Sequence, residues 1–111
     1  MSQPDMEKLS QEEVERRRNN SLGLDWVIKS NQLTIHLSLT SENEVNRLLI
    51  QLDQLAERQR HHPDVAVKGQ EVTISLTTHD AAGITVRDFR YAEELEAYLI
   101  DNVRFMESRN G

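Results

Sequence analysis

The chain has 111 residues, enough for one domain with a modest hydrophobic core and too few for a second core. Its formal net charge of −6 argues against a surface that neutralises nucleic-acid phosphates. Cysteine is absent, which excludes disulfides, zinc–thiolate sites and thiol catalysis. No apolar run reaches the length of a membrane span, and residues 1–18 lack the apolar stretch of a secretory signal, so we expect a cytoplasmic protein.

The N-terminal part predicts one short, exposed helix. We expect residues 1–9 to form a flexible N-terminus and residues 10–111 to form the domain. Ser10 is a suitable N-cap, and Glu13 follows it at the spacing of a capping box. Good helix formers continue from there to about Arg18.

Two strands follow this helix. Residues 26–28 predict a first, short strand. Residues 33–39 alternate strictly between apolar and polar side chains, which is the pattern of a half-buried strand. Ser30 and Asn31 lie between the two segments and are suited to a hairpin turn.

A long amphipathic helix is predicted next. Ser41 can cap its N-terminus, and apolar residues recur at helical spacing as far as Ala56. The helix should end near Arg60, because the residue that precedes Pro63 is disfavoured in the helical region.

The C-terminal half predicts two more strands and a helix. Residues 65–67 form a short strand, residues 68–70 a turn, and residues 72–76 an alternating strand. The last helix begins after the N-cap Thr85. Its predicted apolar stripe comprises Phe89, Ala92, Leu95, Leu99, Val103 and Met106.

These elements predict an α+β fold in the order α-β-β-α-β-β-α. The four strands would form one antiparallel sheet with a polar and an apolar face. The helices would pack on the apolar face.

Three histidines lie at the ends of predicted elements. His61 and His62 follow the second helix, and His79 follows the fourth strand. Glu57 precedes His61 by one helical turn, so its carboxylate can reach the same side. The plain alternative is three surface or hydrogen-bonded histidines. Metal binding is disfavoured, because adjacent helical residues diverge by about 100° and His61 and His62 would not share one ion. No nucleophile-elbow sequence supports a Ser-His-Asp triad.

The chain resembles the pterin-4a-carbinolamine dehydratase family at these positions. The similarity is strongest from His61 to Asp88 and reaches back more weakly to about Trp26. The residues that carry it are Glu57, His61-His62-Pro63, Thr78-His79-Asp80 and Asp88.

The resemblance implies dehydration of a 4a-hydroxytetrahydropterin to a quinonoid dihydropterin. His61, His62 and His79 would then supply acid and base, since histidine titrates near neutral pH. Glu57 would orient a histidine or bind the pterin, backbone groups of Thr78 would hold the ring edge, and Asp80 would also bind substrate. No metal or redox cofactor is implied. A homo-oligomer, dimer or tetramer, is implied as well. The open edges of the predicted sheet also favour pairing, and Tyr91 and Tyr98, which lie off the main stripe of the last helix, are possible contacts.

The chain also departs from the family pattern. Aromatic residues are usual where Leu37, Leu39, Val65 and Gly69 stand, and Arg60 replaces a small or acidic residue. A flat ring gains from an aromatic wall, so we expect a weakened ligand pocket.

This combination is similar to the divergent dehydratase-like proteins that assist Rubisco assembly in bacteria with α-carboxysomes. It predicts a chaperone-like Rubisco assembly factor, cytoplasmic or carboxysome-associated, with weak or no dehydratase activity. The alternative is an active 4a-hydroxytetrahydrobiopterin dehydratase in tetrahydrobiopterin recycling. A third class, a binding module for a transcription factor, has no specific support in the sequence.

Overall fold

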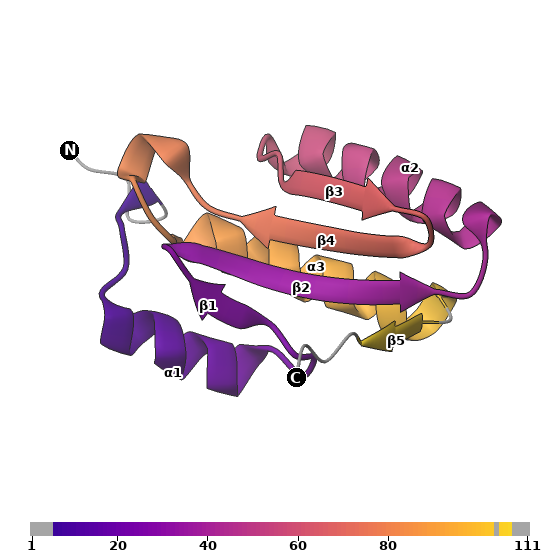
Figure 1. Cartoon of the computed structure of the whole chain (residues 1–111). Helices are drawn as coiled ribbons and strands as arrows, with labels where there is room; N and C mark the ends of the chain where they lie inside the picture. Colours follow the sequence, from indigo (N-terminus) through magenta and orange to yellow (C-terminus); the bar gives the residue numbers. More distant parts are fainter. Residues whose placement is uncertain (1–5, 104, 108–111) are drawn as a thin grey trace.

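The computed structural model describes residues 6–103 and 105–107 of the chain (Figure 1). The elements of this part of the chain are three α-helices, the 3₁₀ turn η2 and five strands. The helices are α1 (Gln11–Ser21), α2 (Glu42–Gln59) and α3 (Val86–Asn102), and the 3₁₀ turn is η2 (His79–Ala81). The strands are β1 (Val27–Lys29), β2 (Gln32–Leu39), β3 (Asp64–Lys68), β4 (Glu71–Leu76) and β5 (Phe105–Glu107).

The sheet confirms the predicted α+β order. Its strands are antiparallel in the order β1-β2-β4-β3, and the alternating strands β2 and β4 lie side by side at its centre. The predicted hairpin turn is also confirmed. Ser30 and Asn31 have φ angles of 53° and 61°, the left-handed pair that a two-residue hairpin favours.

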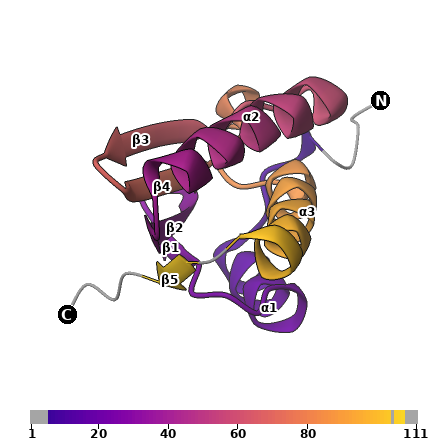
Figure 2. The ribbon, with the colours of Figure 1, turned by 90° about the vertical axis from the view of Figure 1, so that its right-hand side faces the viewer.

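All three helices pack on one face of the sheet (Figure 2). The alternation of β2 decides which side chains meet them, because Leu33, Ile35, Leu37 and Leu39 are buried beneath the helices. The helices contribute their own apolar stripes to the same core: Val14 from α1, Leu48 and Leu52 among others from α2, and Leu95 and Leu99 among others from α3.

Each helix begins at the residue that the sequence predicts. The hydroxyls of Ser10 and Ser41 accept hydrogen bonds from backbone N–H groups in the first turns of α1 and α2. Thr85 caps α3 in a full capping box with Asp88.

The connection between α1 and β1 is bound to α3 by a buried carboxylate. Glu96 accepts hydrogen bonds from the backbone N–H groups of Gly23 and Leu24 and from the indole of Trp26, over 2.8–2.9 Å. Arg18 donates to two carbonyls of the same connection. This contact positions α1 on the rest of the molecule.

The C-terminal prediction needs a correction. The last helix ends at Asn102, and Met106, predicted to continue its stripe, lies in the additional strand β5. The main chain of β5 pairs with the end of β2, so its backbone hydrogen bonds are made with the sheet instead of within a helix.

Leu9, in the segment expected to form a flexible N-terminus, contacts the rest of the domain. Residues 1–5 lie outside the described residues, but Leu9 donates its N–H to Ile84 at 2.8 Å and packs against the core. Leu9 is therefore held against the core by both a hydrogen bond and packing. No helix in the described ranges is long and apolar enough to cross a membrane.

Candidate active site

An open cleft of about 270 Å³ lies where the end of α2 meets the connection between β4 and α3. All three predicted histidines line it, together with two threonines, one aspartate and two arginines. The lining residues are Arg60, His61, His62, Thr77, Thr78, His79, Asp80 and Arg87. The histidines thus come together from segments that are 17 residues apart in the chain, from His62 to His79.

His79 is positioned by a closed loop at the end of β4. The N–H of Thr78 donates to the carbonyl of Gly83 at 2.9 Å, and the N–H of Gly83 donates back at 3.3 Å. The 3₁₀ turn η2 lies inside this bridge, so His79 and Asp80 are exposed at the cleft on a short, fixed loop. The same bonds engage both backbone groups of Thr78, which were expected to hold the ring edge.

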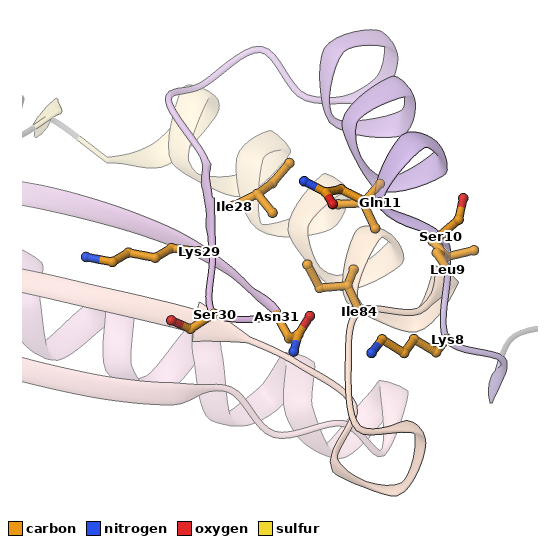
Figure 3. Close-up of a pocket in the computed structure, with 10 residues that line it drawn as sticks. Lys8, Leu9, Ser10, Gln11, Ile28, Lys29, Ser30, Asn31 and Ile84 are labelled. Atoms are coloured by element: carbon orange, nitrogen blue, oxygen red, sulfur yellow. The ribbon is translucent and has the colours of Figure 1, made fainter.

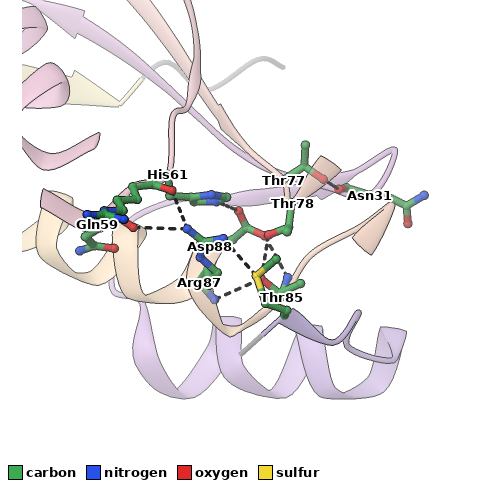
Figure 4. A network of polar contacts seen from close by, with 10 residues as sticks. Asn31, Gln59, His61, Thr77, Thr78, Thr85, Arg87 and Asp88 are labelled. Atoms are coloured by element: carbon green, nitrogen blue, oxygen red, sulfur yellow. Dashed lines mark hydrogen bonds and ion pairs between the residues drawn. The ribbon is translucent and has the colours of Figure 1, made fainter. Parts of the chain in front are cut away.

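His61 is the buried member of the site, with 8% of its surface exposed. Its Nε2 lies 2.5 Å from Oδ1 of Asp88, which is fully buried at the start of α3 (Figure 4). The rings of His61 and Tyr91 also meet in a T-shaped arrangement, with ring centroids 6.4 Å apart and an interplanar angle of 70°. The imidazole is thereby fixed in both position and orientation.

The hydrogen bonds of Asp88 determine which nitrogen of His61 carries the proton. Oδ2 of Asp88 accepts from the hydroxyl of Thr78 and from the N–H of Thr85, both at 2.9 Å. When Asp88 is ionised, both of its oxygens are acceptors, and Oδ1 receives the Nε2–H of His61. Nδ1 of His61 is the nitrogen left for a ligand or water.

The end of α2 directs His61 toward Asp88. Arg60 adopts the left-handed conformation, with φ 52° and ψ 45°, and turns the chain sharply. The guanidinium of Arg87 donates to the carbonyls of Gln59 and Arg60, at 3.3 and 2.5 Å. These carbonyls at the end of the helix thereby gain a hydrogen-bond partner. Pro63 follows two residues after His61 and prevents the helix from resuming.

The structure brings most of the predicted residues together and leaves one outside. Glu57 is exposed on α2 and is absent from the cleft lining. Its expected proximity assumed that the helix continued to His61, whereas the turn at Arg60 breaks that spacing. Arg60 and Arg87 line the cleft and were not predicted as site residues. The sequence feature that could have identified Arg60 as a site residue is its position directly before the His61-His62 pair.

The positions that lack family aromatics do not line the cleft of this chain. Leu37 and Leu39 are buried in the core under the helices. Val65 is on the edge strand β3, and Gly69 forms the β3–β4 turn with φ 62°. The lack of aromatic residues at these four positions therefore removes no side chain from the lining of this cleft.

A second cavity, of about 450 Å³, lies between the start of α1 and the β1–β2 hairpin (Figure 3). Its walls combine apolar side chains such as Val14, Ile28 and Ile84 with Lys8 and Lys29. Among the described residues that line it there is no histidine or carboxylate. The histidine cleft is therefore the better candidate for acid–base chemistry, although it is the smaller of the two.

The groups in the cleft suit proton transfer without a metal-binding geometry. Within the described ranges, no group of three or more His, Cys, Asp or Glu residues is arranged to hold a metal ion. Beside the site, burial and then the nearby carboxylate of Asp53 raise the pKa of the Tyr91 hydroxyl well above its ordinary value. That hydroxyl donates to the carbonyl of Leu52 at 2.8 Å, so Tyr91 is a structural support of the site.

Comparison with known proteins identifies relatives of the chain. The family model described as pterin 4 alpha carbinolamine dehydratase matches residues 7–98. A protein of Roseiflexus sp. (strain RS-1), assigned to these dehydratases, is 35% identical over 89 residues, which cover 80% of this chain and 94% of that protein. A similarly assigned protein of Christiangramia forsetii is 38% identical over 93 residues, covering 82% and 92%.

The fold has a close counterpart among solved structures. The crystal structure of a transcriptional coactivator/pterin dehydratase from Brucella melitensis superposes with a TM-score of 0.73 at 22% identity. The match covers 81% of this chain and 96% of that one. At 22% identity this likeness supports only the shared fold. Family membership rests instead on the family-model match and on the more similar relatives. The chain belongs to the pterin 4 alpha carbinolamine dehydratase family.

Proposed function

We propose that the protein dehydrates a 4a-hydroxytetrahydropterin in the histidine cleft. The observation that carries the proposal is the buried His61–Asp88 pair, 2.5 Å apart, in a cleft that His62 and His79 also line. The reaction breaks the bond between the ring carbon and its hydroxyl, which leaves as water after protonation. A ring N–H proton is lost, and its electron pair forms the new C=N bond. No electrons are exchanged with a cofactor.

The environments of the histidines support a division of roles. His61 acts as the base in this proposal, because the carboxylate of Asp88 stabilises the imidazolium that forms when Nδ1 takes the ring proton. His62 and His79 are exposed at the cleft, where they can protonate the leaving hydroxyl and exchange protons with solvent. Asp80, exposed on η2, is placed to accept a hydrogen bond from a pterin N–H group.

The weak activity predicted from the missing aromatics loses its main argument in the structure. None of the four positions lines the cleft, whereas His61, His62 and His79 all do. We therefore favour the active dehydratase, the reverse of the ranking that the sequence suggests.

A direct assay with 4a-hydroxytetrahydropterin tests the proposal. Wild type should exceed the spontaneous rate, and His61→Ala or His79→Ala should lower turnover by about 100-fold or more. His36→Ala is the matched control, because His36 lies on β2, outside the cleft, and bonds to Thr73. Wild-type turnover at the spontaneous rate, or full activity in both cleft variants, would reject the dehydratase.

A role in Rubisco assembly is the second proposal, and a surface suited to protein contacts supports it. The edge strand β3 pairs only with β4 in the described sheet, and all its residues are exposed, including Val65 and Val67. An open edge of this kind readily pairs with another chain. Co-expression with Rubisco subunits should raise the yield of assembled enzyme, and an unchanged yield would reject this role. Carboxysome association belongs to the same proposal.

The same edge supports the proposed homo-oligomer, a dimer or tetramer. Of the two tyrosines suggested as contacts, Tyr91 is fully buried within the chain, and Tyr98 packs partly against the core. Any self-association therefore depends on other residues than Tyr91. Light scattering at micromolar concentration should give a mass above that of the monomer. A monomeric mass would reject the oligomer.

A further inference from the structure

The histidine cleft contains two arginines on a protein that is acidic as a whole. Arg60 and Arg87 line it, and Asp80 is the one carboxylate among its lining residues. Asp88 lies behind the lining and is engaged by His61, Thr78 and Thr85. The whole chain, in contrast, carries a formal net charge of −6. Two cationic side chains thus lie where a ligand would bind.

The two arginines differ in what their guanidinium groups do. The guanidinium of Arg87 bonds to the carbonyls of Gln59 and Arg60 and contacts the sulfur of Met6. Its donors are therefore engaged in holding the end of α2. The side chain of Arg60 is exposed and makes no hydrogen bond or ion pair within the described part of the chain. Arg60 is the cation available to a ligand.

The backbone of Arg60 gives an independent reason to expect a use for its side chain. Arg60 adopts the left-handed conformation that favours glycine, because a Cβ atom is strained there. A long cationic side chain therefore stands at a position where glycine would be less strained. Strain retained beside a cleft is consistent with a functional side chain.

We propose that Arg60 makes the cleft selective for pterins whose side chain carries a phosphate or carboxylate group. A guanidinium binds both groups through paired, charge-assisted hydrogen bonds, which an uncharged hydroxylated side chain cannot match. This inference rests on the proposed function, since it concerns the substrate class of the same cleft. It assigns to Arg60 a role in specificity, separate from the proton transfers of the histidines.

Calorimetric binding of two matched ligands tests the inference. The probes are neopterin and its terminal phosphate monoester, which share the ring and differ in one anionic group. The wild type should bind the phosphate ester about tenfold more tightly at low salt. The preference should shrink as the salt concentration rises, because the site is open to solvent.

Three variants separate the charge of Arg60 from its backbone effect. Arg60→Gln keeps the Cβ strain and removes the charge, so it should bind both ligands equally. Arg60→Lys should retain part of the preference. Arg47→Gln is the matched control on α2, about 20 Å from Arg60 along the helix, and should keep the full preference.

The possible failures can be told apart. Equal binding of the two ligands by wild type, or an undiminished preference in Arg60→Gln, overturns the inference and leaves the proposed function standing. Binding of neither ligand overturns the inference together with the proposed function.

Discussion

Helix α3 carries two buried carboxylates about two turns apart, and they serve different purposes. Asp88 and Glu96 are 0% and 7% exposed, and each accepts three hydrogen bonds. The partners of Glu96 are two backbone N–H groups and an indole, none of which titrates near neutral pH. One partner of Asp88 is His61, which lines the cleft.

The comparison shows that burial of a carboxylate does not by itself identify a functional group. Both side chains must be satisfied by donors, because an unpaired buried charge is costly. Asp88 differs from Glu96 because one of its donors, His61, lines the cleft and can also exchange protons with a ligand. We therefore expect Glu96 to act on folding, and Asp88 to act on both folding and chemistry.

The largest expected effect is on turnover in Asp88→Asn. Its amide nitrogen would replace an acceptor with a donor, either toward His61 or toward Thr78 and Thr85, and would favour the wrong tautomer of His61. We expect kcat to fall by about 100-fold or more. In Glu96→Gln, turnover per folded molecule should stay within about twofold of wild type. Steady-state assays corrected for the folded fraction check both, and equal losses would end the distinction.

The next effect is on stability in Glu96→Gln. A glutamine can accept with one oxygen only, so at least one of its three donors loses its partner. The free energy of unfolding should fall by about 2 kcal/mol in urea titrations. Glu93→Gln, an exposed change on the same helix, is the control and should leave stability unchanged. A Glu96→Gln protein as stable as wild type would show that the carboxylate does not hold the α1–β1 connection.

The third expected effect is a gain of stability in Arg60→Gly, at the edge of the candidate site. It removes the left-handed strain at Arg60 and should raise the free energy of unfolding by about 0.5–1 kcal/mol. Arg47→Gly, in the interior of α2, should instead lower it by about 1 kcal/mol. Thermal unfolding distinguishes the two, and a loss of stability in both would show that Arg60 is not strained.

The smallest effect concerns Tyr91, which lies between the two carboxylates on α3. Burial and the nearby Asp53 raise the pKa of its hydroxyl above the ordinary value of 10.0. Tyr91 stays protonated in the folded state at a pH where the unfolded chain ionises, so stability present below pH 10.0 is lost as the pH rises.

Comparison with Tyr91→Phe measures this contribution. Wild type should lose about 1 kcal/mol more than the variant between about pH 9 and about pH 11. Parallel pH profiles would contradict the assigned cause. At neutral pH the variant should be less stable by about 1 kcal/mol, because it lacks the hydrogen bond to Leu52.

The fold was largely predictable, because its strands and helices are marked by local patterns. The alternation of residues 33–39 and the caps at Ser10, Ser41 and Thr85 are readable without tertiary contacts. Strand β5 was not, since no glycine or proline stands between Asn102 and Met106 to end the helical pattern. Its pairing with β2 is a long-range contact that periodicity does not encode.

The candidate site was predictable in its membership and less so in its geometry. The three histidines meet in one cleft, as their positions at element ends suggested. Glu57 does not join them, because the left-handed turn at Arg60 cannot be anticipated from helical spacing. Asp88 was recognised as part of a motif and a helix start, while its bond to His61 depends on how α2 and α3 pack.

The most direct test of the account is a double-mutant cycle of His61 and Asp88 in the dehydratase assay. If Asp88 acts on the chemistry through His61, Asp88→Asn should lower kcat in the wild type and have almost no further effect in His61→Ala. The rate is measured at saturating substrate and corrected for the folded fraction. A cycle in which the two losses multiply would contradict the account, because Asp88 would then act on the reaction independently of His61.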